Sequence, residues 1–209
     1  MNFRVEFKNR PLVFIEGLKK WVFLHECVWT GPALTFPLTS VHYLNTEYPA
    51  SKKLFREHLK LGNVTLDHVI QELSVVREDT SFGRLGELLL HLNKYLKTKS
   101  PPGCLSKLKG KKIIPVRQLD GTLCRMTYDT DFWYFADRKK LQQIFDGKLP
   151  VINFDVTTVK KLQPLIKAME LSEYELSKID SCTSETVGDK MYDEERSLDL
   201  RTRSLHLQR

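Results

Sequence analysis

The chain has 209 residues and a formal net charge of +7, with 41% apolar and 28% charged residues. This composition is typical of a globular protein and too apolar for a mostly disordered one. No uncharged apolar run approaches the roughly 20 residues that a membrane-spanning helix needs, and the N-terminus lacks the apolar core of a signal peptide. We therefore expect an intracellular protein, cytoplasmic or nuclear, with no membrane partner, built as one large domain or two small ones.

The first 45 residues look irregular or strand-like, and Gly31-Pro32 marks a turn within them. We expect Trp21 and Trp29 to anchor a small core in this part of the chain, because large aromatic side chains favour burial.

Three amphipathic helices are expected next. The first covers 49–61, with Gly62 in the left-handed conformation that ends many helices. Thr65 can cap the second, whose apolar residues recur at helical spacing. The third follows Ser81 and presents one long apolar stripe. Short connections predict that these helices pack as neighbours.

The sequence changes character after a Lys-Ser-Pro-Pro-Gly stretch at 99–103, which ends the helical part. Asp120-Gly121 is a strong hairpin turn signal, so paired strands are expected over 112–116 and 122–126. Aromatic and apolar runs predict two further strands, over 132–135 and 149–154.

Two helical segments accompany these strands. Asp137 can cap the first and Gly147 can close it, whereas Asp155 can cap the second and Pro164 starts or kinks its continuation. The predicted fold class is therefore α+β, a helical cluster followed by a small mixed sheet with helices. The expected parts are an N-terminal strand and helix cluster, a basic Pro/Gly connector, a small α+β unit and a flexible tail with a terminal helix over 198–208: residues 1–98, 99–111, 112–179 and 180–209.

Positive charge is concentrated around the connector. Between Lys94 and Arg125 there are nine basic residues and one acidic residue. A basic segment can attract phosphate or an acidic partner, although nucleic-acid modules usually interleave aromatic residues with their basic ones, and the connector does not. The expected contact residues are the connector lysines: Lys107, Lys109, Lys111 and Lys112.

Motifs that would carry catalysis or bind a cofactor do not emerge. The four cysteines are far apart and are expected to be free thiols. Gly103 and Gly110 are too far apart for a phosphate-binding P-loop. The run before Asp120-Gly121 has Gln118 where a haloacid-dehalogenase-like phosphatase has its nucleophilic Asp. His25 and Cys27 could supply two metal ligands, but a zinc site needs about four. We therefore expect no catalytic, cofactor-binding or metal-binding residue.

One long stretch is more specific. Residues 135–154 read FADRKKLQQIFDGKLPVINF, and the chain continues into VKKLQPLI at 159–166 and LSEYELS at 171–177. This stretch resembles a region of very large fungal proteins that carry a sacsin-like or NO VEIN-like histidine-kinase-type ATPase domain. The ECVWTGP element at 26–32 resembles another part of the same region, so that the resemblance covers about 27–179.

The resemblance implies lineage rather than activity. In such proteins the ATPase domain precedes this region and binds ATP-Mg through E-x-x-x-N and D-x-G-x-G patterns, neither of which occurs here. The last twelve residues are similar to the start of a further helical element of the family, which suggests a fragment, a truncated gene product or a degenerate paralogue.

The leading functional prediction is a non-catalytic accessory or interaction segment without a cofactor. Its partners would be other domains of a larger parent protein or other proteins. The first alternative is binding of nucleic acid or an acidic partner through the basic connector. The second is an unrecognised enzyme, which would require a pocket that gathers His25, Cys27, Asp129 and Asp131.

Overall fold

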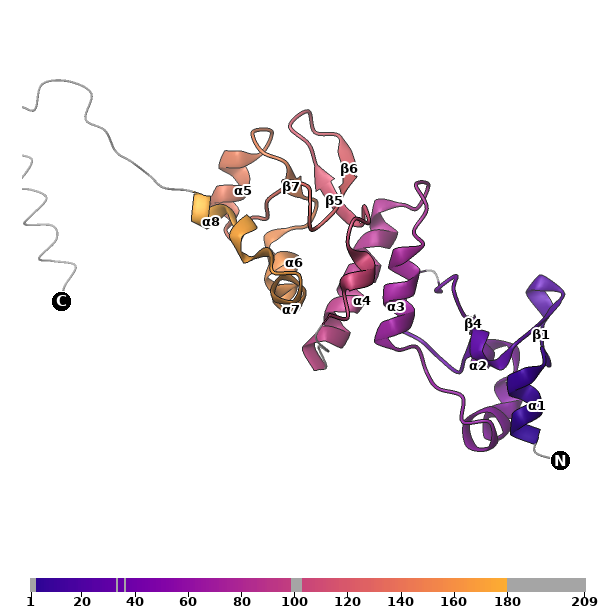
Figure 1. Cartoon of the computed structure of the whole chain (residues 1–209). Helices are drawn as coiled ribbons and strands as arrows, with labels where there is room; N and C mark the ends of the chain where they lie inside the picture. The colour runs from indigo at the N-terminus through magenta and orange to yellow at the C-terminus, as the bar shows by residue number, and fades with distance from the viewer. Residues whose placement is uncertain (1–2, 33, 36, 99–102, 180–209) are drawn as a thin grey trace, which may run out of the picture. The chain divides into compact units, whose positions relative to one another are not determined.

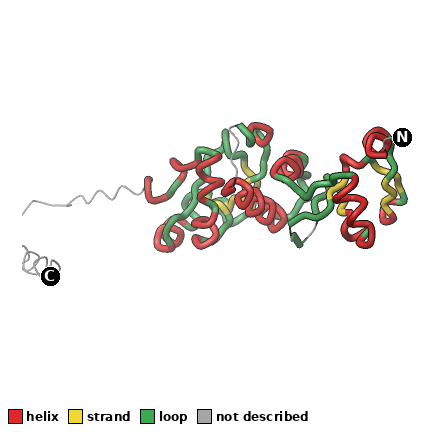
Figure 2. Tube along the Cα trace, turned by 90° about the horizontal axis from the view of Figure 1, so that it is seen from below, coloured by secondary structure: helices red, strands yellow, loops and turns green. Residues whose placement is uncertain are grey.

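The computed structural model describes residues 3–32, 34–35, 37–98 and 103–179 (Figure 1). It has the predicted α+β fold, with short strands set among helices and loops (Figure 2). Residues 180–209, predicted as a tail with a terminal helix, lie outside the described residues.

The N-terminal part is richer in regular structure than its sequence indicates. Strands β1 and β2 form an antiparallel hairpin, whereas β3 and β4 pair in parallel. A short helix, α1, precedes the hairpin and buries none of its residues, so no apolar stripe revealed it. The elements are α1 Phe3–Asn9, β1 Val13–Ile15, η1 Glu16–Leu18, β2 Lys20–Val22, η2 Leu24–Glu26, β3 Cys27–Val28, β4 His42–Tyr43 and α2 Leu44–Glu47.

The two tryptophans of this part have different environments. Trp29 is buried in an apolar cluster that also contains Leu44 and Phe55. Trp21 is 58% exposed and contacts Phe14 across the hairpin, with ring centroids 5.3 Å apart. The expectation that both tryptophans anchor a core is therefore wrong for Trp21, because β2 turns that residue to the outer face of a two-stranded ribbon.

The helical region follows the predicted order. Its elements are η3 Pro49–Ser51, the π-helical turn η4 Leu54–His58, α3 Leu66–Ser74 and α4 Phe82–Thr98. Thr65 caps α3 as predicted, in a reciprocal arrangement with His68. The left-handed residue after the first helical run is Lys60, with φ of 57°, rather than Gly62. The π-helical turn ends this run earlier than the 49–61 pattern indicates.

The C-terminal part contains a three-stranded sheet. Strand β5 is central, with β6 and β7 both antiparallel to it. The predicted hairpin is confirmed, with Gly121 at φ of 81° in its turn. The predicted strand over 132–135 is reduced to isolated bridges at Tyr134 and Phe135. The elements are η5 Ser106–Leu108, β5 Ile114–Arg117, β6 Leu123–Met126 and β7 Val151–Ile152.

The remaining helices surround this sheet region. Asp155 caps α6 as predicted, accepting a hydrogen bond from the Thr158 amide at 2.7 Å. Asp137 does not cap α5: Arg138 occupies that position and forms an ion pair with Asp137. The elements are α5 Lys139–Phe145, α6 Val156–Lys161, α7 Gln163–Ala168, η6 Leu171–Tyr174 and α8 Leu176–Ile179.

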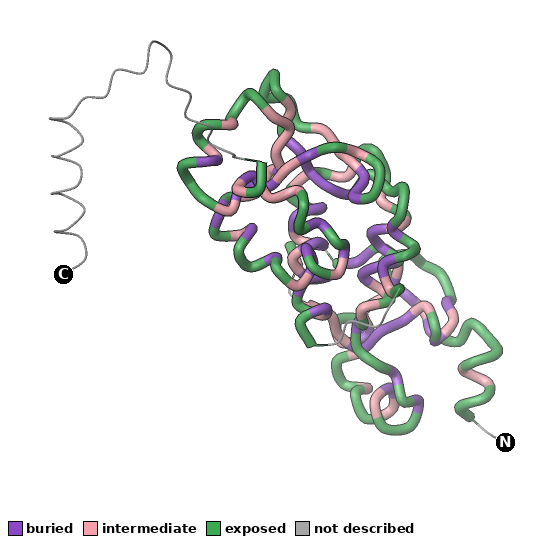
Figure 3. Tube along the Cα trace, turned by 60° about the vertical axis from the view of Figure 1, so that its left-hand side comes forward, coloured by how far each residue is buried: buried purple, intermediate pink, exposed green. Residues whose placement is uncertain are grey.

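The largest apolar cluster of the described residues has members on both sides of the predicted connector and within its described part. It joins buried leucines of α4, such as Leu92, to Leu105 and Leu108 after the Pro-Gly stretch and to Ile114 in β5. Helix α4 packs against α3, α7 and β5, and Figure 3 shows buried stretches gathered inside the exposed turns. Residues 1–179 accordingly form one compact unit.

Candidate functional site: a basic face on an ordered connector

The predicted connector has a defined backbone where the structure describes it. Gly103 and Gly110 adopt left-handed conformations, with φ of 72° and 68°, and the short helix η5 lies between them. Turn hydrogen bonds run from the Leu108 amide to the Leu105 carbonyl at 2.9 Å and from the Lys111 amide to the Leu108 carbonyl at 3.1 Å. Glycine is favoured at both ends because it adopts positive φ without steric cost.

Two leucines and one loop hold this segment in place. Leu105 and Leu108 are buried in the main core, and η5 packs against α3. The Tyr128 hydroxyl donates to the Leu105 carbonyl at 3.2 Å, while the Asp129 carboxylate accepts the Gly110 amide at 2.9 Å. The loop that contains Tyr128 and Asp129 is thereby hydrogen-bonded to this segment at two points, Leu105 and Gly110.

All four predicted contact lysines are exposed on this segment: Lys107, Lys109, Lys111 and Lys112. None of them forms an ion pair within the part of the chain that the structure describes. Leu105 and Leu108 are buried in the core, and the lysines between and after them face solvent. Their charges are available to an external anion.

A hollow of about 510 Å³ lies beside Lys111 and Lys112, and Arg125 adds a third cationic side chain to its wall. The guanidinium of Arg125 is fixed, because it donates to the carbonyls of Arg77 and Thr80 and lies 5.6 Å above the centre of the Phe82 ring. Sequence reasoning placed Arg125 in a basic stretch and in a strand paired with 112–116, and that pairing is confirmed. It did not predict the bonds to Arg77 and Thr80 that fix the side chain on this wall.

The wall of this hollow is mixed in character. Leu73, Val76 and Ile113 supply apolar surface, and Glu78 supplies one acidic group. Cationic side chains around a concave surface raise the local concentration of anions, and the attraction weakens as salt increases. The arrangement can hold carboxylate or phosphate groups by charge.

The residues considered for an enzyme site make local contacts instead, and Cys27 and His25 are the first two of them. Burial, together with the neighbouring charge of Glu26, raises the pKa of the Cys27 thiol to about 12, so that little thiolate exists at neutral pH. The Cys27 Sγ donates to the Phe23 carbonyl, and His25 is exposed and stacks on Phe23. Among the described residues, no group of three or more His, Cys, Asp and Glu is arranged to hold a metal ion.

The paired carboxylates Asp129 and Asp131 also have local roles. Asp129 bonds to Gly110, and Asp131 accepts the Thr127 amide at 2.7 Å. This segment is a loop and not a strand, and the two carboxylates stabilise its turns, although Asp129 is exposed to solvent. Asp120 accepts the Thr122 amide within its hairpin turn, as the turn interpretation of Asp-Gly expects.

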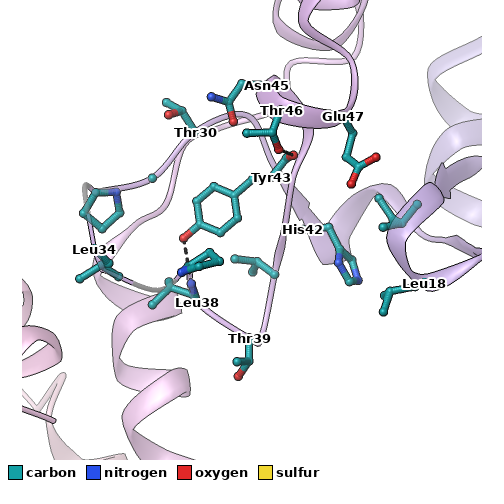
Figure 4. Close-up of a pocket in the computed structure, with 15 residues that line it drawn as sticks. Leu18, Thr30, Leu34, Leu38, Thr39, His42, Tyr43, Asn45, Thr46 and Glu47 are labelled. Carbon is teal, nitrogen blue, oxygen red and sulfur yellow. Dashed lines mark hydrogen bonds between the residues drawn. The ribbon is translucent and has the colours of Figure 1, made fainter. Parts of the chain in front are cut away.

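A second and larger hollow, of about 670 Å³, lies in the N-terminal part between the β1–β2 hairpin and the segment around β4 (Figure 4). Its wall contains His42, Tyr43 and Asn45. Sequence reasoning missed it. Part of its wall, Thr30 to Pro32, belongs to the ECVWTGP element, but that element carries no binding motif, and it meets the segment around β4 through the pairing of β3 with β4.

Together, the fold and the basic face define a small α+β protein whose basic segment, described over 103–112, is held by packing and hydrogen bonds. The chain belongs to the family described as a domain of unknown function (DUF8348), whose model matches residues 67–180. That range contains the basic face, and the hollow near β4 precedes it. No curated protein and no solved structure matches the chain. In the part of the chain that the structure describes, no helix is long and apolar enough to cross a membrane.

Proposed function

We propose that this chain is a non-catalytic interaction module that contacts an acidic protein surface through its connector lysines. The observation that carries the proposal is the combination of four exposed lysines with a fixed backbone. Leu105, Leu108 and the bond from Gly110 to Asp129 hold the segment that bears the lysines.

A fixed basic segment is suited to recognition. Binding by a disordered segment costs free energy because its backbone must become ordered, and an ordered segment avoids that cost. Complementary charge mainly increases the association rate and selects against wrong partners. The connector is therefore expected to bind rapidly and to lose affinity as the salt concentration rises.

The resemblance to sacsin-like and NO VEIN-like proteins suggests where such a partner would lie. In those proteins the similar region follows an ATPase domain, and this chain lacks the two ATP-binding patterns of that domain. The proposed partner is an acidic face of another domain of a larger parent protein, or of a separate protein.

Charge reversal at the connector tests the proposal. The variant carries Lys→Glu at 107, 109, 111 and 112, and its matched control carries Lys→Glu at the exposed lysines 52, 53, 140 and 148. The probe is a fluorescent poly-glutamate peptide, and binding is followed by anisotropy at about 50 mM and about 200 mM salt. We expect the connector variant to lose about tenfold or more in affinity, since exposed ion pairs contribute about 0.2–1 kcal/mol each.

The control variant has the same net charge and is expected to retain most of the binding. Equal losses in the two variants would show that net charge alone attracts the peptide, and the proposal would then be wrong. Circular dichroism of both variants checks that the fold is retained.

Single-stranded nucleic acid is a second candidate ligand, favoured by one observation. The bond between Asp129 and Gly110 places the loop containing Phe132 against the connector, and Phe132 is 78% exposed. An exposed aromatic ring beside basic residues is the arrangement on which bases stack. The connector sequence by itself lacks such a ring.

Phe132→Ala separates the two candidates. If the ligand is nucleic acid, this variant should weaken binding of a single-stranded oligonucleotide about fivefold or more and leave poly-glutamate binding unchanged. If the oligonucleotide binds no better than the peptide and Phe132→Ala changes neither affinity, the nucleic-acid candidate fails.

A further inference from the structure

The hollow beside β4 has the size and lining of a small-molecule site. Its volume of about 670 Å³ lies within the roughly 300–1,000 Å³ typical of ligand pockets. Figure 4 shows the Tyr43 ring on one side and His42, Glu47 and Leu18 on the other. Apolar and polar side chains are both present, as in sites for amphipathic molecules.

The wall of the hollow is held by close packing and backbone hydrogen bonds. A Cβ on Gly31 would lie only 2.4 Å from the Tyr43 ring, so glycine is required for this approach. The Tyr43 hydroxyl accepts the Leu38 amide at 3.2 Å, and the Asn45 amide donates to the Trp29 carbonyl at 3.0 Å. The ring and the backbone of α2 are thus positioned before any ligand arrives.

Two threonine hydroxyls on this wall already donate hydrogen bonds to other groups of the protein. Thr39 Oγ1 donates to the Glu72 carboxylate at 3.0 Å, and Thr46 Oγ1 donates to the Tyr43 carbonyl at 2.8 Å. Asn45 Oδ1 has no hydrogen-bond partner but is buried from solvent, so a ligand in the hollow does not reach it. Glu47 is exposed and lines the hollow. Among the described residues of this wall it is the one acidic side chain, and none is a lysine or arginine, so the wall favours a cation.

We propose that this hollow binds a small amphipathic amine. Its apolar part packs against Leu18 and the Tyr43 ring, and its ammonium group pairs with the carboxylate of Glu47, which Figure 4 shows on the same side as Leu18. A ligand carboxylate would instead be repelled by Glu47.

This site is separate from the basic face. Its wall residues lie between 15 and 47, whereas the connector lysines lie between 107 and 112. The amine proposal can therefore fail while the interaction proposal stands, and the reverse also holds.

Three matched probes test the ligand class on the full chain: hexylamine, hexan-1-ol and hexanoate. Binding is followed by NMR of assigned methyl groups. We expect hexylamine to shift the methyl signals of Ile15 and Leu18, hexan-1-ol to shift them at higher concentration, and hexanoate to leave them in place. Absence of selective shifts with hexylamine, or equal affinity for all three probes, would overturn the proposal.

Two exposed positions provide variants that should fold. Glu47→Gln should weaken hexylamine about threefold, the contribution of one exposed charge pair, and leave hexan-1-ol unchanged. Leu18→Ala should weaken both probes, because it removes apolar contact surface. Glu57→Gln is the matched control, an exposed glutamate outside this wall. If Glu47→Gln leaves the ratio of hexylamine to hexan-1-ol affinity unchanged, the amine assignment is wrong.

Discussion

At the scale of single residues, Glu72 joins distant parts of the chain. Its buried carboxylate accepts the amides of Thr39 at 3.0 Å and Ser40 at 2.9 Å, and Arg84 lies 3.4 Å away. Burial by itself raises the pKa of Glu72, but the hydrogen bonds from Thr39 and Ser40 outweigh burial, so that the pKa is lowered from 4.5. The segment that leads to β4 is therefore fastened to α3 by an ionised carboxylate.

The lowered pKa predicts a pH dependence of stability. A carboxyl group whose pKa is lower in the folded state stabilises fully above its unfolded pKa, near 4.5, and this stabilisation is lost as the pH falls through the folded pKa. We expect Glu72→Gln to cost about 2 kcal/mol at neutral pH, and we expect this cost to shrink with acid.

Urea unfolding at about pH 7 and about pH 3 measures the effect. The exposed Glu57→Gln is the control and should change stability little at either pH. A Glu72→Gln penalty that stays constant between the two pH values would contradict the role of ionised Glu72.

At the scale of elements, the sequence predicts the helices and helix caps that a few neighbouring residues determine. The stripes of α3 and α4 and the caps Thr65 and Asp155 are read from a few neighbouring residues, and all are confirmed. Helix α1 has no buried face and therefore no stripe. The burial of Leu105 and Leu108 depends on α4 and β5 and has no periodic signal within a lysine-rich stretch.

The candidate site likewise has one part that the sequence predicts and another that depends on tertiary contacts. Charge alone identified the four exposed lysines. The β5–β6 pairing brings Arg125 near them. Its guanidinium is fixed by bonds to the carbonyls of Arg77 and Thr80, which lie more than 40 residues away and have no local signal. The order of the connector likewise follows from tertiary contacts with Leu108 and Asp129.

Leu108 tests whether the order of the connector matters for binding. This side chain is fully buried, so Leu108→Ala should cost about 2–5 kcal/mol. Leu119→Ala, at a position 54% exposed, is the matched control and should cost little. We further expect Leu108→Ala to weaken poly-glutamate binding, although every lysine remains, because the connector must then become ordered on binding.

The measurements are urea unfolding and peptide anisotropy under conditions where the variant is still folded. Unchanged affinity in a destabilised Leu108→Ala variant would show that the lysines act as charges alone, independent of the order of their backbone.

At the scale of the whole molecule, α4 connects the part before residue 99 to the part after 111. The Asn93 amide group donates to the Lys161 carbonyl at 2.8 Å and accepts the Leu165 amide at 3.0 Å. These bonds lie within the apolar contacts of α4 with α7 and β5. The apolar cluster around Leu44 and Phe55, by contrast, is made entirely of residues before 62.

This difference predicts how a fragment of residues 1–98 behaves. We expect the amides of 82–98 to exchange hydrogen rapidly in the fragment and slowly in the full chain, because α4 loses its partners in β5 and α7. The amides around Leu44 and Phe55 should stay protected in both, which makes them an internal control. Hydrogen exchange followed by mass spectrometry measures both regions in one experiment. Equal protection of 82–98 in fragment and full chain would mean that the helical cluster folds without the sheet, and that the residues around 99–111 separate two independent folding units.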